Sequence, residues 1–362
     1  VLLLLFFVCP ANAEEWQVRE GDGQPGSDVV IVEELFQRAE TGWARSVRIE
    51  DPQALLEGAR STLAYMRRNA DSDPRGVHPG ILQSYGVTVH QVEWTLSLLA
   101  QTAKNNPEKL QDSEWLERNF DLYLWKADAT PRPEPNDDLI RLTKYVVYEV
   151  DGSTTKTERF AYALWQVPTE ELHLSDNEAE LRPNLLRYQL TRQEILSGAL
   201  QVRYPEAATP LVWLERENVH EAILQGTIAV RTESGEVRWF NVHRSNNRPY
   251  KRGFPAEEQE RYWFFRPVTS PMGWGWQAEN KIGLFPYASV AGDVDNCGIG
   301  KVFWLQDGEH VRLVILSDTG GAFQPNLHQL DWFVGVVSGE KELQDKCSKL
   351  PPFVRSGILI AK

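Results

Sequence analysis

The sequence has few cysteines, few histidines and no excess of basic residues. Its 362 residues include 3 Cys, 7 His and 2 Met, and 38 Lys and Arg stand against 51 Asp and Glu. A net charge of −13 with no cluster of Lys and Arg argues against a nucleic-acid-binding protein. The histidines are scattered and neither HExxH nor CxxC occurs, so the sequence predicts no metal site. No cofactor is expected.

Long apolar stretches are also missing, except at the start of the chain. Residues 1–8 read VLLLLFFV, and small residues precede a cleavage point after Ala13. This pattern predicts a secretory signal peptide over residues 1–13 and a mature protein exported to the periplasm or cell envelope. A lipoprotein anchored through Cys9 is the alternative, although Val8 stands where a lipobox has a small residue. No later stretch reaches the ~20 apolar residues of a membrane helix, so the mature chain is expected to lack a transmembrane segment.

Two cysteines remain after removal of the predicted signal peptide, Cys297 and Cys347. In an oxidising compartment they form either a disulfide or two isolated thiols. Their separation in space decides between these states, and their spacing along the chain does not reveal it. Both states therefore remain open at this point.

The chain begins with a helical part and continues with a β-rich part. Residues 14–40 are expected to be a loose N-terminal arm, and helices are predicted to start after Asp51 and after Thr88. A Pro-rich acidic connector follows at residues 128–138. Beyond it, β-branched and aromatic runs predict short strands, and Ser234-Gly235 predicts a hairpin. The pattern is typical of a mainly β protein with small helices.

Three aspartates in the last third of the chain lie in settings that suit chemistry. Asp318 ends an apolar run and precedes Gly320 and Gly321, which let a ligand approach the backbone closely. Asp331 lies within the apolar run LDWFVG, where desolvation raises the pKa and favours the protonated form that a general acid needs. Asp293 follows the run YASVAG. Each of the three carboxylates has the alternative role of a cap or turn residue bonded to backbone amides.

The segments around these aspartates resemble the C-terminal domain of the MltA-type membrane-bound lytic murein transglycosylases. SVAGD at 289–293, DTGGA at 318–322 and Asp331 beside an aromatic residue resemble the three aspartate motifs of that family, in the same order. The resemblance extends over roughly residues 50–362. Five further segments are similar to family motifs: 142–148 (LTKYVVY), 160–165 (FAYALW), 191–195 (TRQEI), 224–227 (LQGT) and 246–250 (NNRPY).

This resemblance implies a fold and an activity. The fold would be mainly β with small helices, a double-psi β-barrel catalytic domain interrupted by a second β-domain. The barrel would comprise residues 41–147 and 263–362. The inserted domain, residues 148–262, would form the other wall of a glycan groove. The family cleaves the MurNAc-GlcNAc β-1,4 bond of peptidoglycan without water and leaves 1,6-anhydro-MurNAc ends. Peptidoglycan glycan strands are therefore the expected partner, and we expect a monomer.

Carried over by position, Asp331 would be the single catalytic acid and base, and Asp318 and Asp293 would be supporting catalytic residues. Asp293 would hold local backbone or raise the pKa of Asp331 through like charge. The aromatic residues Trp274, Trp276 and Trp332 either stack on sugar rings or fill the core. The candidate substrate contacts are Tyr145, Gln225, Gly226, Asn246, Tyr250, Gly320 and Gly321. Gln225, Asn246 and Tyr250 have the alternative role of hairpin or turn residues.

Some positions depart from the family pattern. Lys144 stands where the family has a glycine, and Ile228 replaces the second glycine of its Gln-Gly-Ser-Gly hairpin. These changes leave open an alternative function, a non-catalytic cell-wall glycan-binding protein on the same scaffold. A hydrolase of another polysaccharide is the third interpretation, with Asp318 as the second carboxylate.

Overall fold

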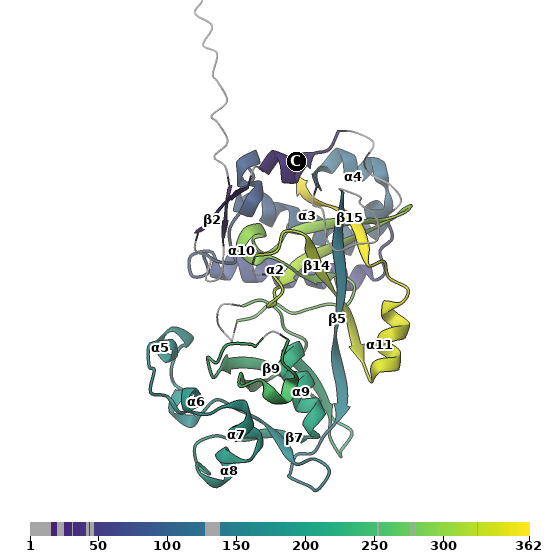
Figure 1. The fold of residues 1–362 in the computed structure, drawn as a ribbon. Coiled ribbons are helices and arrows are strands. Elements are labelled where there is room, and N and C mark those ends of the chain that lie inside the picture. Colours follow the sequence, from purple (N-terminus) through teal and green to yellow (C-terminus); the bar gives the residue numbers. More distant parts are fainter. Residues whose placement is uncertain are drawn as a thin grey trace, which may run out of the picture.

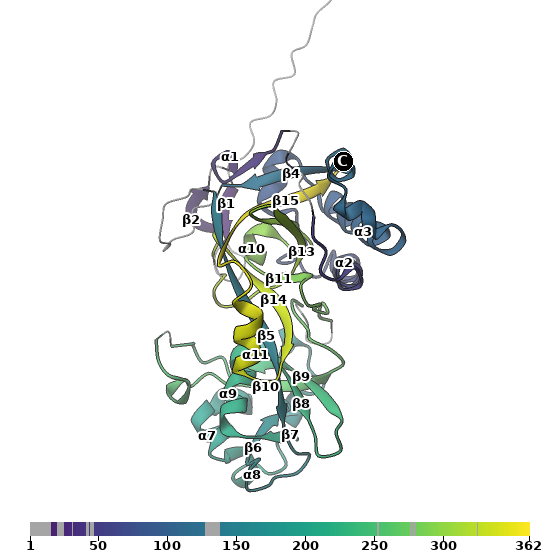
Figure 2. The ribbon, with the colours of Figure 1, turned by 90° about the vertical axis from the view of Figure 1, so that its right-hand side faces the viewer.

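The computed structural model describes residues 16–19, 25–30, 32–40, 43, 47–126, 138–251, 253–275, 277, 280–323 and 325–362. The predicted signal peptide and Trp276 lie outside the described residues. The described residues form two lobes, and the long strand β5 (Leu139–Asp151) runs from one lobe into the other (Figure 1). The view turned by 90° shows the same division (Figure 2).

The described part of the chain is mainly β with small helices, as the sequence predicts. Besides β5, its strands are β1 (Trp16–Arg19), β2 (Pro25–Val30), β3 (Phe36–Arg38), β4 (Phe120–Trp125), β6 (Tyr162–Trp165), β7 (Pro210–Leu214), β8 (Thr227–Arg231), β9 (Val237–Ser245), β10 (Trp263–Val268), β11 (Ser289–Ala291), β12 (Val302–Asp307), β13 (His310–Asp318), β14 (Gln329–Val337) and β15 (Phe353–Ala361). Its α-helices are α1 (Val32–Leu35), α2 (Pro52–Asn69), α3 (Val89–Asn105), α4 (Ser113–Asn119), α5 (Asp176–Glu180), α6 (Leu186–Gln189), α7 (Arg192–Leu196), α8 (Ala199–Val202), α9 (Arg216–Gln225), α10 (Val294–Cys297) and α11 (Glu340–Cys347). Short 3-10 helices cover Gly80–Tyr85, Pro107–Gln111, Thr169–Glu171 and Ala256–Glu258.

Helix starts follow the local signals in the sequence. The Asp51 side chain accepts hydrogen bonds from the backbone N–H groups of Gln53 and Ala54 at the start of α2. Thr88 and Gln91 form a capping box at the start of α3. These side chains satisfy backbone donors that the first helical turn leaves without partners. The predicted helix starts are therefore confirmed.

One large mixed sheet contains eleven of the described strands, in the order β10-β9-β8-β5-β14-β11-β13-β12-β15-β4-β3. An additional pairing of Leu139, Ile140 and Arg141 of β5 with β15 joins two non-neighbouring strands of this order. The six strands β5, β14, β11, β13, β12 and β15 consequently form a closed ring of pairings. The far end of β5 pairs with β8 and carries the sheet into the second lobe.

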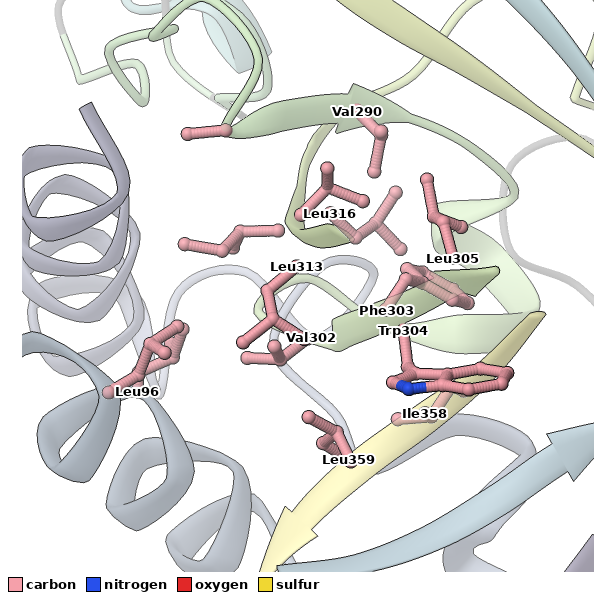
Figure 3. Packing of buried hydrophobic residues seen from close by; sticks show 14 of the residues in the cluster. Leu96, Val290, Val302, Phe303, Trp304, Leu305, Leu313, Leu316, Ile358 and Leu359 are labelled. Atoms are coloured by element: carbon pink, nitrogen blue, oxygen red, sulfur yellow. The ribbon is translucent and has the colours of Figure 1, made fainter. Parts of the chain in front are cut away.

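The largest hydrophobic cluster fills the lobe that contains the ring. Leu96 of α3, Val302 of β12, Leu313 of β13 and Leu359 of β15 meet in this cluster (Figure 3). Two smaller clusters fill the other lobe, around Trp165 and around Phe240. The packing of α2 and α3 against the ring lobe buries the apolar faces that their sequence periodicity predicts.

A fourth cluster lies where the lobes meet. It combines Val147 of β5, Ala229 of β8 and Phe333 of β14 with Leu284, and Tyr145 packs against it. Because these residues come from both lobes, apolar burial fixes one lobe against the other at this place. Tyr145 and Phe333 are also within a few residues of the candidate site.

The N-terminal segment differs from the loose arm that its polar, Gly-rich composition predicts. Its described residues include the paired strands β1 and β2, and β3 pairs with β4. Val32 and Phe36 are buried, and the ring of Phe36 stacks on Trp125. Strand pairing with β4 and these buried side chains together anchor part of this segment to the ring lobe.

The described helices and the two cysteines bear on the predicted export of the protein. None of the described helices is long and apolar enough to cross a membrane. Cys297 and Cys347 are free thiols, the first buried and the second partly exposed. Burial raises the pKa of the Cys347 thiol above its ordinary value.

The packing of the ring lobe predicts the cost of truncating Leu359, which is 1% exposed. Leu359→Ala should lower the free energy of unfolding by about 2–5 kcal/mol because it leaves a cavity in the core. Leu181 is 82% exposed, so Leu181→Ala is the matched control and should change it by less than ~0.5 kcal/mol. Urea unfolding of both variants measures the difference, and equal losses would contradict this account of the core.

Candidate active site

Two of the predicted catalytic aspartates lie in one row across neighbouring strands. Asp331 of β14 pairs with Ala291 of β11 on one side and with Thr143 of β5 on the other. Asp318, at the end of β13, pairs with the same Ala291. Because adjacent strands are about 4.8 Å apart, the two aspartate Cα atoms are about 10 Å apart. The sheet therefore brings together two carboxyl groups that are separate in the sequence.

The carboxyl group of Asp331 is in an environment that favours its neutral form. Its Oδ1 atom is buried and has no hydrogen-bond partner among the described residues. Burial raises the pKa of Asp331 to about 6, although Thr143 and the charges of Lys144 and Arg141 oppose the rise. Desolvation is thus larger than the effect of the neighbouring cations. The result is a carboxyl group whose pKa suits general acid chemistry near neutral pH.

Asp318 is held by two hydrogen bonds. The Tyr145 hydroxyl donates to Oδ2 at 3.1 Å, and the Thr319 backbone N–H donates to Oδ1 at 2.9 Å. Burial raises the pKa of Asp318 to about 7, and the charge of Asp331 adds to the rise, while Lys281 opposes it. The charge of ionised Asp331 contributes to the raised pKa of Asp318, so the two carboxyl groups titrate as an interacting pair.

Tyr145 lies at the site, where it holds Asp318. Its ring packs against Phe333 with centroids 5.2 Å apart, and its hydroxyl reaches Asp318 from β5. Burial and the charge of Asp318 raise the pKa of Tyr145 well above its ordinary value, so the hydroxyl remains a donor. The sequence predicts a sugar contact for Tyr145, and this bond gives it a second role.

Asp293 lies behind the site and organises backbone. It is 2% exposed and caps α10, accepting hydrogen bonds from the backbone N–H of Asn296 at 3.0 Å and from its Nδ2 at 2.8 Å. Its Oδ2 also accepts the Asn326 backbone N–H at 2.9 Å. Asn326 belongs to the loop between β13 and β14, which connects Asp318 to Asp331. Asp293 therefore has the capping role that the sequence left open, and it fixes the loop between the two acids.

The two glycines of that loop are not required by crowding. A Cβ atom on Gly320 would meet only the Phe323 ring at ordinary contact distance, and one on Gly321 would meet nothing within 4 Å. Gly321 is exposed. The ligand contact that the sequence predicts at these two glycines stays a prediction.

The remaining candidate contacts lie in the second lobe. Gln225 ends α9, and Gly226 follows it in a left-handed conformation with φ 78°. Tyr250 is 55% exposed in the connection between β9 and β10. Asn246 is buried, and its amide donates to the carbonyls of Leu190 and Glu260 at 2.9 Å each. Its Oδ1 accepts the Tyr262 N–H at 2.9 Å, so the whole side chain is used within this lobe.

The described candidate tryptophans fill the core. Trp332 is fully buried and meets Tyr287 edge to face, with centroids 5.7 Å apart. Trp274 is 9% exposed, and its Nε1 donates to Asp73 at 2.8 Å. Buried rings do not offer a face for stacking on a sugar, so the core alternative holds for these two residues.

Sequence reasoning did not assign two parts of the site. Thr143 stands beside Asp331, and the motif LTKYVVY was the only signal for it. The second part is the segment around Gly273, where a Cβ atom would lie 2.5 Å from the Ser317 carbonyl oxygen and 3.0 Å from Asp318 Cβ. Glycines at 273 and 275 were the available sign of such a close approach.

The chain is similar in structure to several solved proteins, although no sequence comparison finds a relative. No protein-family model and no curated protein sequence matches the chain. Among solved structures, the chain is similar to a membrane-bound lytic murein transglycosylase from Agrobacterium tumefaciens, with a TM-score of 0.60, 18% identity, and coverage of 86% of this chain and 92% of that one. It is also similar to Escherichia coli MltA with bound chitohexaose (TM-score 0.57, 17% identity, 90% and 94% covered). A third similar structure is MltA from Neisseria gonorrhoeae, with a TM-score of 0.54, 16% identity, and coverage of 90% of this chain and 95% of that one.

The chain has the MltA fold. At 16–18% identity the similarity concerns the fold and extends over most of both chains. The resemblance of the sequence motifs to the MltA type is thereby confirmed at the level of architecture. A fold by itself does not determine function, which depends on the side chains that the fold places in the site.

The raised pKa of Asp318 predicts a pH-dependent stability difference. The ordinary pKa of an aspartate in an unfolded chain is about 3.9, whereas that of Asp318 in the folded chain is about 7. The folded state therefore keeps its proton to higher pH, and this group stabilises the fold at low pH and loses that contribution as the pH rises to about 7. In Asp318→Asn, the free energy of unfolding should rise relative to the wild type from about pH 4 upward and level off above about pH 7.

Urea unfolding at a series of pH values measures this difference. Loss of the Tyr145 hydrogen bond adds a term that does not depend on pH in this range. The exposed Asp345 provides the control variant, Asp345→Asn. A constant difference between Asp318→Asn and the wild type across the range would show that Asp318 does not titrate with a raised pKa.

Proposed function

We propose that the protein is a peptidoglycan lytic transglycosylase, with Asp331 as its single acid and base. The observation that carries the proposal is the Asp331 carboxyl group, whose buried Oδ1 lacks a hydrogen-bond partner among the described residues and whose pKa is raised to about 6. The MltA fold supports the substrate class, because the neighbours with this fold are named lytic murein transglycosylases and one of them holds chitohexaose.

The reaction needs one proton that leaves the carboxyl group and returns to it. Protonated Asp331 donates to the glycosidic oxygen while the bond from C1 of MurNAc to that oxygen breaks. The resulting carboxylate then takes the proton of the MurNAc 6-hydroxyl, whose oxygen forms the new bond to C1. The products are a free GlcNAc 4-hydroxyl and a 1,6-anhydro-MurNAc end. No water is consumed, so a second carboxylate to activate it is not needed.

Asp318 has a supporting role in this proposal. Tyr145 and Thr319 hold its two oxygens, which leaves it suited to orient substrate or loop and less suited to activate water. A hydrolase would use Asp318 as a second carboxylate on the other face of the sugar. The two hydrogen bonds to Asp318 therefore favour the transglycosylase over the hydrolase.

The glycan is proposed to lie across the junction of the two lobes. Gln225, Gly226 and Tyr250 would contact it from the second lobe, and Gly320 and Gly321 from the loop beside Asp318. Asn246 is left out because its amide is buried and fully used. The closed ring of six strands is proposed to be a double-psi β-barrel, and the protein is proposed to act in the periplasm or cell envelope after export.

Digestion of purified sacculi tests the function directly. The wild type should release muropeptides with anhydro ends, identified by mass spectrometry. Asp331→Asn should reduce the rate by about 10²–10⁴, the usual contribution of a positioned acid or base, whereas the exposed Asp345→Asn should not. Reducing ends would establish a hydrolase, and binding to sacculi without release would establish the non-catalytic binding protein.

The pH dependence of the reaction tests the role of Thr143. Since the protonated form of Asp331 starts the reaction, kcat/KM should fall as the pH rises through about 6. Thr143 lies beside Asp331 and lowers its pKa, so Thr143→Val should move the fall in kcat/KM to higher pH. The loss of turbidity of sacculi, followed at a series of pH values, measures the midpoint of this fall in both proteins. An unchanged midpoint in Thr143→Val would show that Thr143 does not lower the pKa of Asp331.

A further inference from the structure

A hairpin in the connection between β10 and β11 lies between the two lobes. We call residues 271–284 the connecting hairpin, of which 276, 278 and 279 lie outside the described residues. The Gly273 N–H donates to the Ile282 carbonyl at 2.8 Å, and the Ile282 N–H returns a bond to the Trp274 carbonyl at 2.7 Å. These backbone bonds make the hairpin a defined unit.

The connecting hairpin is fixed to the ring lobe directly beside Asp318. The Trp274 backbone N–H donates to the Ser317 carbonyl at 2.9 Å, and its indole binds Asp73. Gly273 passes so close to Ser317 and Asp318 that a Cβ atom does not fit there. A shift of this part of the hairpin would therefore be transmitted to Asp318.

One buried side chain of the second lobe binds the same hairpin. Asn241 of β9 is 2% exposed, and its Nδ2 lies 3.2 Å from the Met272 carbonyl oxygen. The same Nδ2 lies 3.0 Å from the Gly226 carbonyl oxygen and 2.7 Å from the Thr227 hydroxyl. Asn241 thus joins the turn that follows Gln225 to the residue preceding Gly273.

The orientation of this amide follows from its surroundings. A flipped amide would place its oxygen against the carbonyl oxygens of Gly226 and Met272, which is repulsive. In the observed orientation Oδ1 is buried and has no hydrogen-bond partner among the described residues. An unpaired buried acceptor is unfavourable, so the contribution of Asn241 to the structure comes from its donors.

We propose that Asn241 is a positioning residue that fixes the turn at Gln225 and Gly226 relative to the aspartates Asp318 and Asp331. This inference rests on the proposed function, in which that turn contacts the glycan. Asn241 touches neither the acids nor the solvent, and it acts through Met272 and Gly273. A glycan held at the turn is then presented to Asp331 at a fixed offset, and small errors in such an offset are costly to catalysis.

Dependence of the rate on glycan length distinguishes this role from a purely structural one. In the proposed glycan path, a long GlcNAc-MurNAc oligomer contacts both the turn and Asp331, whereas a short one contacts only the sites beside Asp331. The wild type should therefore use the long oligomer with a higher kcat/KM. Loss of folded protein would lower both rates by the same factor, whereas loss of positioning lowers the rate for the long oligomer more than the rate for the short one.

The experiment compares four proteins on a short and a long oligomer. Asn241→Ala removes the donors, and Asn241→Ser is a milder second variant whose shorter side chain does not reach the Met272 carbonyl. Thr95→Ala is the matched control. Thr95 is also buried, donates to the Gln91 carbonyl at 2.7 Å and accepts the Ala361 N–H at 2.8 Å, but it joins α3 to β15, away from the hairpin.

The long-to-short ratio of kcat/KM should fall about tenfold in Asn241→Ala, the scale of one lost positioning contact, and should be unchanged in Thr95→Ala. A ratio equal to that of the wild type in both Asn241 variants would overturn the inference. If the wild type releases no product, the proposed function fails. In that case, calorimetry measures the affinities of the same proteins for the same oligomers. The inference is supported if the wild type binds the long oligomer more tightly than the short one and Asn241→Ala loses this difference. It is overturned if the difference is unchanged in Asn241→Ala.

Discussion

Pairing between β15 and the first residues of β5 is the constraint on which the rest of the architecture depends. It closes six strands into a ring, and closure fixes the neighbours of every strand in it. β11 is thereby held between β13 and β14, so Asp318 and Asp331 flank the same alanine. Since β5 continues beyond the ring to pair with β8, the same strand also sets the direction in which the second lobe leaves the first.

Burial then determines the chemistry of this row of residues. Lys144 and Arg141 lie near enough to Asp331 to lower its pKa, yet desolvation is the larger effect and leaves the pKa at about 6. Lys144 donates to the carbonyl of Leu350 at 3.3 Å and to that of Pro351 at 2.5 Å, so backbone oxygens share its positive charge. A cation at the position where the MltA-type motif has a glycine is therefore compatible with an acid next to it. This is the physical reason why the altered motif does not by itself argue against activity.

The junction between the lobes has two kinds of contact with different consequences. The apolar cluster of Val147, Ala229, Leu284 and Phe333 provides non-directional burial. The amide of Asn241 provides directional bonds to the turn at Gly226 and to Met272. Apolar burial keeps the lobes together, whereas the hydrogen bonds select one relative position. A glycan that contacts both lobes depends on the second property more than on the first.

Features that arise within a few residues follow directly from the local sequence. Asp51 and Thr88 start helices because their side chains accept hydrogen bonds from backbone N–H groups of the first helical turn. The apolar run around Asp331 predicts a desolvated acid. The order of the motifs led to the MltA type, whose fold the structure has. The partners of these residues, by contrast, depend on how distant parts of the chain fold together. Tyr145 reaches Asp318 across 173 positions of the chain, Asn246 and Trp332 are buried, and Asn241 meets Met272. Such contacts depend on strand closure and on the meeting of two lobes, and local sequence patterns do not encode either.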